Sequence, residues 1–270
     1  MFLSKEALIK AILIPALFLP VGIFFFVLSY LIGKSEASPV PCLIAGIVFT
    51  LISVVSAPLT VYFEGVSKLY SAGVRLVHKE LLPEEFISLY KEKSEPGKNV
   101  ISRPGYDILE MLYNACDLLD DRAGARVALN KMRELKPRFR GRSAVLEAAE
   151  AYKRGDIASG DAFLSKAEEK YGSSEVRAAA DALRKSERAM ASGDFAAAKE
   201  YYSGIAGADS VLGPDSDAIL KANWYMYIIC RKTGDPASSD YLGYCAEHGG
   251  STAIGRKAGL ILRREGKSEK

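Results

Sequence analysis

Residues 193–202 read Gly-Asp-Phe-Ala-Ala-Ala-Lys-Glu-Tyr-Tyr, and this stretch decides the fold class of the larger part of the chain. Glycine suits a tight turn because it carries no side chain. The alanines that follow allow a second helix to approach its neighbour closely. The stretch therefore predicts the turn and the second helix of a helical hairpin.

Three other places in the sequence follow the same scheme of helix, turn and helix. The four turns lie at Asp120-Asp121, Gly155-Asp156, Gly193-Asp194 and Gly234-Asp235. Successive turns are 35, 38 and 41 residues apart. This spacing predicts stacked hairpins, each of which buries its apolar face against its neighbours.

The spacing and the hairpins resemble the tetratricopeptide repeat (TPR) family, whose unit has about 34 residues. The best unit is 106–137, and the resemblance covers roughly residues 105 to 262. Two units are weaker, since Gly160 stands where a core alanine is usual and Pro236 directly follows the last turn. The resemblance implies an all-α fold with a TPR-like α-solenoid of helix-turn-helix repeats in residues 105–270. An irregular helical bundle is the alternative.

Two uncharged stretches precede this region, residues 11–32 and 37–63. Each is long enough to cross the ~30 Å hydrocarbon core of a bilayer as a helix. The connector 33–39 is too short to do more than turn the chain back. Residues 1–63 are therefore expected to form a two-helix transmembrane hairpin, with the second span at about 40–63.

Small side chains recur on one face of the second stretch, where they allow membrane helices to approach closely. They are Cys42, Gly46, Thr50, Ser53 and Ala57. We expect this face to pack against the first span. Residues 64–104 are expected to form juxtamembrane helices and a linker, with Pro83 opening a new helix.

The charges that flank the two apolar stretches indicate their orientation. Lys5 and Lys10 lie near one end of the first stretch, and Lys34 alone lies in the connector. Three cations follow the second stretch: Lys68, Arg75 and Lys79. We therefore expect an integral protein of the cell (inner) membrane with both termini cytoplasmic. A cleaved signal peptide is the alternative, and the length of the first apolar stretch argues against it.

The charge after Phe63 is nearly balanced, because 33 of the 36 basic and 31 of the 33 acidic residues lie there. No nucleic-acid binding is expected from so small a net charge. Catalytic and metal motifs are incomplete: His78 and His248 accompany no nucleophile motif, and Cys245 with His248 supplies two of the four ligands that structural zinc needs. We expect no enzymatic activity, no metal and no cofactor.

A basic patch closes one of the expected helices. Its cations are Lys131, Arg133, Lys136, Arg138, Arg140 and Arg142. Interaction with the helix dipole and simple solvation explain such a run. The functional interpretation is a contact with anionic lipid or with an acidic partner.

A second candidate surface combines aromatic and cationic side chains. The first helices of repeat hairpins line a concave groove, and here they would offer a binding site for an acidic or C-terminal peptide. The candidate partner-binding residues are Arg142, Tyr152, Lys153, Lys221, Trp224, Arg231 and Lys232. Core packing is the alternative role for Trp224 and for some of the tyrosines.

The leading functional hypothesis is a membrane-anchored adaptor or scaffold that presents a cytoplasmic TPR-like domain to protein partners. The lipid bilayer is then a second partner, through two transmembrane helices. The alternative is an accessory subunit of a larger membrane complex for transport, secretion or envelope synthesis, in which the hairpin itself packs against other subunits.

Overall fold

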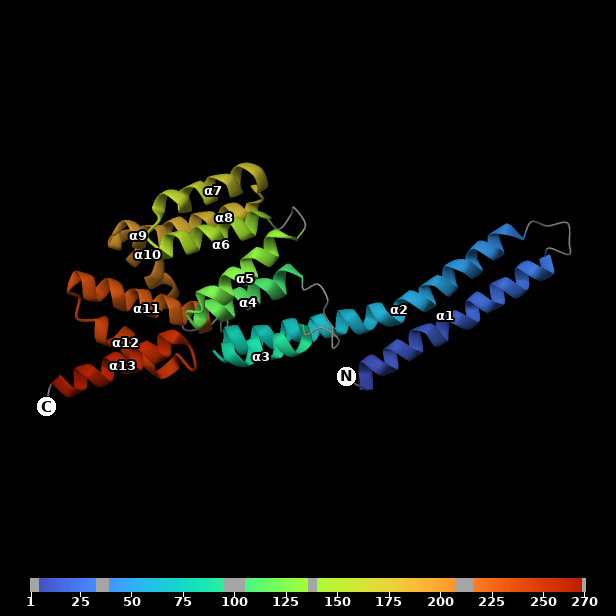
Figure 1. The fold of residues 1–270 in the computed structure, drawn as a ribbon, viewed down its shortest axis with the longest axis horizontal. Coiled ribbons are helices and arrows are strands. Elements are labelled where there is room, and N and C mark those ends of the chain that lie inside the picture. Colours follow the sequence, from blue (N-terminus) through green and yellow to red (C-terminus); the bar gives the residue numbers. More distant parts are fainter. Residues whose placement is uncertain (1–4, 33–38, 95–104, 136–139, 207–215, 269–270) are drawn as a thin grey trace. The chain divides into compact units, whose positions relative to one another are not determined.

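The computed structural model describes residues 5–32, 39–94, 105–135, 140–206 and 216–268. Within this part of the chain every regular element is a helix and no strand occurs (Figure 1). The expectation of an all-α fold is confirmed.

The chain divides into two compact units. One unit consists of residues 1–69 and 92–103, and the other of residues 70–91 and 104–270. Val77 and Phe86 of the expected juxtamembrane segment 64–104 are fully buried, and both belong to the second unit. The expected division into residues 1–63, 64–104 and 105–270 stays a prediction.

Two helices pack against each other in the first unit, α1 (Lys5–Ile32) and α2 (Val40–Gly73). A Cβ atom at Gly22 would lie 2.7 Å from the Thr50 hydroxyl and 3.3 Å from the carbonyl oxygen of Gly46. The small face expected on the second stretch therefore lies against α1 at these two positions.

Aromatic rings extend this contact. The ring of Phe49 stacks on Phe25 at 5.6 Å and on Phe18 at 6.1 Å between centroids. Near the other end of the pair, the Ser29 hydroxyl donates a hydrogen bond to the carbonyl oxygen of Pro39 at 3.1 Å. The two helices thus run antiparallel. The side chain of Ala57, the last of the predicted small residues, lies outside the described ones.

One helical segment in the described part of the chain is long and apolar enough to cross a membrane. It is Pro15–Ile32, with 18 residues and a mean hydropathy of 2.2. The apolar part of α2, Val40–Ser56, is shorter. The first expected span therefore has the required length and composition, and the second span stays a prediction.

The second unit begins where α2 ends. A π-helical turn, η1 (Val74–Lys79), continues α2, and α3 (Pro83–Ser94) begins at the expected proline. Six further helices follow in the first part of this unit: α4 (Tyr106–Leu118), α5 (Arg122–Arg133), α6 (Arg140–Lys153), α7 (Ile157–Tyr171), α8 (Ser174–Leu183) and α9 (Ala189–Ser192). A second π-helical turn, η3 (Arg184–Arg188), joins α8 to α9. The last four helices are α10 (Phe195–Ala206), α11 (Ser216–Thr233), α12 (Ser238–His248) and α13 (Ala253–Ser268).

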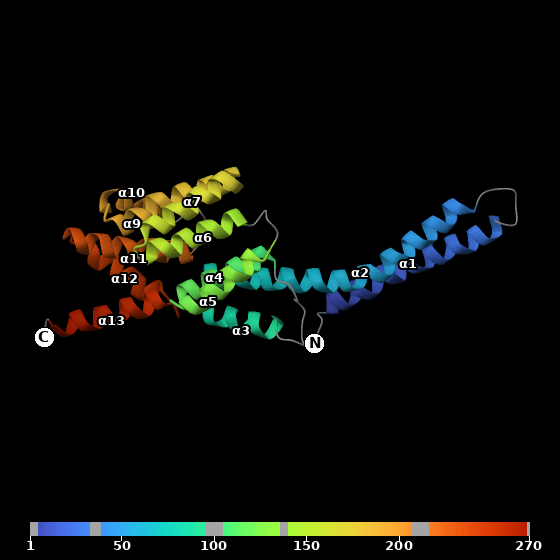
Figure 2. The ribbon, with the colours of Figure 1, turned by 45° about the horizontal axis from the view of Figure 1, so that its top comes forward.

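The helices on either side of each predicted turn pack side by side, as Figure 2 shows for α6 and α7. The first residue of each turn has a positive φ angle: 60° at Asp120, 76° at Gly155, 78° at Gly193 and 73° at Gly234. The amide of the following aspartate donates to a carbonyl five residues earlier, for example from Asp156 to Ala151 at 2.9 Å. This 6→1 hydrogen bond closes a helix at a left-handed residue.

The aspartates also begin the next helix. Asp121, Asp156 and Asp194 each accept a hydrogen bond from the amide three residues later, which is the geometry of an N-cap. At the fourth turn Asp235 accepts instead from the amide of Ala237, and α12 starts only at Ser238. Pro236 accounts for this delay, because it offers no amide hydrogen.

Alanine dominates the contacts between helices. Eight alanines of the described residues are fully buried: Ala115, Ala128, Ala148, Ala151, Ala167, Ala180, Ala198 and Ala258. Gly160 of α7 lies at a similar close contact between helices, because a Cβ atom there would lie 2.3 Å from the ring of Tyr152. The ring of Tyr152 fills the space that a core alanine would otherwise occupy.

The end of the chain returns to the beginning of the second unit. The Ser251 hydroxyl donates to the carbonyl oxygen of Leu81 at 3.2 Å, and Arg256 lies 3.4 Å from Glu84. Leu81 itself has a positive φ of 54°. The last helices thus contact residues that precede the first hairpin.

Candidate binding cleft

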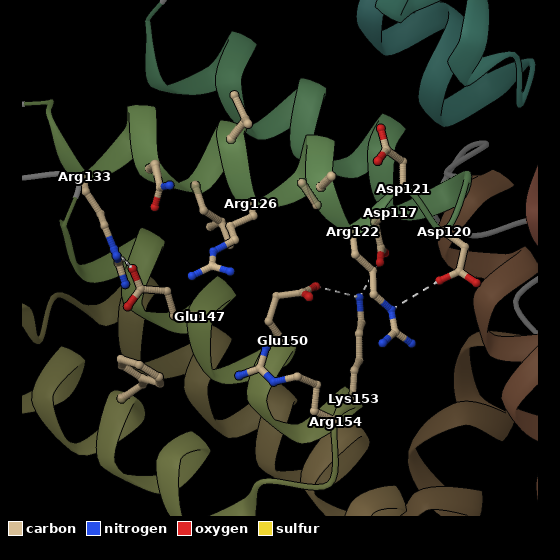
Figure 3. A pocket seen from close by; sticks show the side chains of 16 residues that line it. Asp117, Asp120, Asp121, Arg122, Arg126, Arg133, Glu147, Glu150, Lys153 and Arg154 are labelled. Carbon is tan, nitrogen blue, oxygen red and sulfur yellow. Dashed lines mark hydrogen bonds and ion pairs between the residues drawn. The ribbon is translucent and has the colours of Figure 1, made fainter.

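A cleft of about 740 Å³ opens in the second unit between α5 on one side and α6 and α7 on the other (Figure 3). Its acidic residues are Asp117, Asp120, Asp121, Glu147 and Glu150. Its basic residues are Arg122, Arg126, Arg133, Lys153 and Arg154. Among the described lining residues the number of acidic and basic groups is equal, so the partners of each group decide which charge they present.

The inner end of the cleft is a network that joins three helices. Asp117 of α4 binds the ammonium group of Lys153 of α6 and, at 2.9 Å, that of Lys221 of α11. Glu150 accepts a hydrogen bond from the Tyr113 hydroxyl at 2.7 Å and lies 3.5 Å from Lys153. Both carboxylates are therefore already engaged by the protein.

The remaining acidic groups of the cleft are engaged as well. Glu147 forms an ion pair with Arg133, and Asp120 binds Lys257 of α13 at 2.9 Å. Asp121 is the N-cap of α5. Each carboxylate that the structure describes in the lining thus already has a partner within the protein.

Two arginines differ from the other cations of the lining. Arg122 lies 3.8 Å from Asp120, but Arg126 and Arg154 form no ion pair or side-chain hydrogen bond with another residue in the described part of the chain. In the view of Figure 3 their guanidinium groups lie between the Arg133–Glu147 pair and Lys153. Beside Arg126, the side chain of Val127 is 53% exposed. The cleft thus presents two guanidinium groups that have no ion pair among the described residues, next to an apolar side chain.

The electrostatics of Asp117 follow from its two lysines. Desolvation by itself would raise the pKa of Asp117, yet Lys221 and Lys153 hold that pKa well below its usual range. Burial by itself would lower the pKa of Lys221, and the carboxylates of Asp117 and Asp217 raise it. Asp117 therefore stays ionised and helps to keep the ammonium group of Lys221 charged.

A second carboxylate lies close to this network on η3. Glu187 accepts the Tyr225 hydroxyl of α11, with distances of 2.7 and 2.8 Å to its two carboxylate oxygens. Desolvation raises the pKa of Glu187, an effect that the positive charge of Lys153 only partly opposes. Desolvation and the charge of Glu187 in turn hold the pKa of Tyr225 well above its usual value.

The candidate partner-binding residues do not form one surface. Lys153 and Lys221 meet at Asp117, whereas Trp224 lies 5.4 Å from the ring of Tyr227, which also contacts Arg231.

The other three candidates lie elsewhere. Arg142 covers the ring of Tyr106 at 4.7 Å and binds Glu110 at 2.7 Å. Tyr152 is buried and donates its hydroxyl hydrogen to Asp161 at 2.7 Å. Lys232 is exposed. Most of these side chains are thus occupied by intramolecular contacts.

Several cations of the basic patch are also engaged in contacts within the protein. Arg133 and Arg142 are paired with glutamates, and Lys131 lies over the ring of Tyr90 at 5.8 Å. Arg140 is exposed. The two other patch residues, Lys136 and Arg138, lie outside the described residues.

Several residues of the cleft and its network were not anticipated from the sequence, namely Asp117, Arg126, Glu150, Arg154 and Glu187. Arg126 follows the first turn and Arg154 precedes the second, so turn positions offered a signal for both. Glu187 lies in the run Arg-Lys-Ser-Glu-Arg, which is typical of a solvated surface and hides its partial burial.

Comparisons of the chain with models of protein families, with curated proteins and with solved structures found no match.

Proposed function

We propose that this chain is a membrane-anchored adaptor, in which the apolar N-terminal hairpin holds a TPR-like helical domain at the cytoplasmic side of the membrane. The cleft between α5, α6 and α7 binds an acidic segment of a protein partner. The observation that carries this proposal is the state of the charges in the cleft. The five lining carboxylates of the described residues each have an ion pair or hydrogen bond within the protein, while Arg126 and Arg154 have no ion pair among these residues.

Charge complementarity selects the occupant. A guanidinium group binds a carboxylate through two parallel hydrogen bonds, and such pairs gain strength where water is partly displaced. The exposed side chain of Val127 adds an apolar contact beside them. An acidic peptide segment with an apolar residue satisfies both features, whereas a cationic partner would meet no available carboxylate.

Membrane anchoring is supported by the surface of the first unit. Large apolar side chains remain exposed on both helices, for example Phe24 of α1 at 60% and Val54 of α2 at 66%. Water is a poor solvent for so many apolar groups, and a lipid bilayer accommodates them. The cations Lys5, Lys10, Lys68, Arg75 and Lys79 favour the cytoplasm for both ends of the hairpin.

The TPR-like interpretation is supported by the turns. Four helix pairs are joined at a residue with positive φ, followed by an aspartate that bonds back to the preceding helix. Direct contacts between Asp117 of the first pair and Lys221 of the fourth go beyond the neighbour-to-neighbour packing of an open array. In the proposed array the first helix pair therefore also contacts the fourth, and we call this contact the closure of the array.

Site-specific photocrosslinking tests the adaptor function. A photoreactive amino acid replaces Val127 in the full-length chain, which is expressed in its native host. Crosslinking is carried out on the membranes of these cells. We expect a discrete crosslinked product whose mass spectrum places an acidic segment of another protein at residue 127. The product should disappear in the double variant Arg126→Glu, Arg154→Glu.

The matched control reverses two exposed cations of α7 outside the cleft, Lys166→Glu and Lys170→Glu, and should leave the product unchanged. A photoreactive residue at Ala196, exposed on α10, should give no such product. A product that persists in the cleft variant, or that forms equally from residue 196, contradicts the proposed function.

A further inference from the structure

The charges around Asp117 do not balance when every carboxyl group is ionised. Asp117 of α4 binds the ammonium groups of Lys153 and Lys221, Glu150 of α6 lies 3.5 Å from Lys153, and the carboxylate of Glu187 of η3 interacts electrostatically with both lysines. A further carboxylate that acts on Lys221, that of Asp217, lies 3.0 Å from His78 of η1. The lysines bind Asp117 and, in part, Glu150. Glu187 has no ion-pair partner in the described part of the chain.

The position of Glu187 makes this excess charge structurally significant. Its carboxylate accepts the hydroxyl of Tyr225, so that it connects the third helix pair to α11 of the fourth. The same α11 carries Lys221, which binds the first pair through Asp117. Glu187 is thus part of the junction at which the array closes. It also lies in a π-helical turn, a feature that often marks functional positions in helices.

We propose that the protonation state of Glu187 controls the contact between the first and the fourth helix pairs. With a proton on Glu187, the charges of Lys153 and Lys221 match those of Asp117 and Glu150, and the closure is tight. When the proton leaves, the new carboxylate competes with Asp117 for the two ammonium groups, and the contact between α4 and α11 loosens.

Several other ionisable groups surround Glu187. On α4 and α6 these are Asp117, Tyr113, Glu150 and Lys153, and on α11 they are Tyr225 and Lys221. On α8, which also packs against η3, Asp181 binds Arg184. Helix α10 contributes Tyr201 and Tyr202. The neighbouring α9 carries no ionisable side chain, and Arg184 and Arg188 of η3 bind Glu168 and Asp161 instead.

The tyrosines and Lys221 keep their protons throughout the neutral range. Desolvation and nearby carboxylates raise the pKa of each tyrosine, and the pKa of Lys221 is raised as well. Asp117 remains ionised because its pKa is lowered. Desolvation raises the pKa of Glu187 above its ordinary value of 4.5.

The protonation of Glu187 also affects the binding cleft. Lys153 lines the cleft and is one of the two ammonium groups for which Glu187 and Asp117 compete. Release of the proton from Glu187 therefore changes the position of a cation that faces the cleft. By linkage, an acidic ligand in the cleft changes the proton affinity of Glu187.

Trp224 provides the readout, because it is the single tryptophan of the chain and directly precedes Tyr225 on α11. We would record its emission from the full-length chain in neutral detergent micelles between pH 4.5 and 8. The wild type should show a shift of the emission maximum with pH. Glu187→Gln should remove the shift and hold the emission of the acidic form, while the exposed Glu200→Gln on α10 should behave as the wild type.

Thermal unfolding of the same proteins gives an independent measure. Because Glu187→Gln mimics the protonated carboxyl and still accepts the Tyr225 hydroxyl, it should raise the Tm at pH 7.5 by about 3 °C or more and change it little at pH 4.5. A wild type without a pH-dependent emission shift, a shift that survives in Glu187→Gln, or a Tm at pH 7.5 that is unchanged or lowered overturns the proposal. The adaptor function is tested separately at residue 127.

Discussion

The hydroxyl of Tyr225 donates to Glu187 across the junction between the third and the fourth helix pairs, 2.7 and 2.8 Å from the two carboxylate oxygens. A hydrogen bond to a charged group contributes about 1.5–3 kcal/mol, and its loss leaves a desolvated carboxylate without a donor.

We therefore expect Tyr225→Phe to lower the free energy of unfolding by about 1.5–3 kcal/mol at neutral pH. Denaturant unfolding of the full-length chain, followed by circular dichroism, measures this loss. Tyr171→Phe is the control, because its hydroxyl makes no side-chain hydrogen bond within the described part of the chain. An equal loss in both variants would contradict a specific role for the Tyr225 hydroxyl.

Asp117 is the group whose removal should cost most in the cluster. Asp117→Asn leaves the partly buried ammonium groups of Lys153 and Lys221 without their carboxylate. Exposed ion pairs contribute up to about 1 kcal/mol and fully buried ones lose about 3–5 kcal/mol when broken, so a loss of about 2–3 kcal/mol is expected here. Asp240→Asn, on the exposed side of α12, should cost almost nothing.

The two carboxylates should affect the pH dependence of stability with opposite signs. The pKa of Asp117 is lowered on folding, so its contribution is present above the ordinary value of 3.8 and is lost as the pH falls below it. The pKa of Glu187 is raised, so stability is lost as the pH rises above the ordinary value of 4.5. In urea titrations at several pH values, Asp117→Asn should remove part of the acid loss and Glu187→Gln part of the loss toward neutral pH. Curves parallel to that of the wild type would refute this assignment.

Gly160 offers a test of close packing between α6 and α7. In Gly160→Ala the new Cβ atom would meet the ring of Tyr152, which is held by its bond to Asp161, and overpacking of this kind costs about 1–3 kcal/mol. Gly204→Ala on α10 meets nothing within 4 Å and should instead stabilise the chain by about 0.4–1 kcal/mol. Thermal unfolding distinguishes the two, and two shifts of the same sign would show that the ring of Tyr152 does not limit this position.

Exchange of the hairpin separates the adaptor from the accessory-subunit hypothesis. If the hairpin only anchors the protein, replacement of residues 1–63 by an unrelated two-span anchor of the same orientation should preserve the crosslinked product at Val127. If the hairpin packs against other subunits, the product should be lost although the chain still reaches the membrane. Membrane fractionation of the exchanged chain is the necessary control.

The fold class and the positions of the turns could be predicted from the sequence because they depend on local chemistry. A left-handed residue followed by aspartate specifies the end of one helix and the start of the next within a few residues. Small residues on α2 likewise predicted its contact with α1, since their spacing alone places them on one helix face.

The cleft and its network could not be predicted in the same way. Asp117 and Lys221 are separated by 104 positions in the sequence, and their contact depends on how four helix pairs pack together. Lys153 and Lys221 were predicted as free cations for a partner, but a carboxylate from another helix already binds both. Arg126 and Arg154 have no ion pair because the described carboxylates that line the cleft bind other groups, a condition that no single segment of sequence reveals.

The closure between Asp117 and Lys221 restricts how this protein can evolve. A linear stack of hairpins tolerates duplication or deletion of a unit, since each interface forms between adjacent members only. Here, an inserted or missing hairpin would carry α11 away from α4 and break the contacts at both Asp117 and Asp120. The number of helix pairs should therefore be the same in every descendant of this chain that keeps those two aspartates and their lysine partners.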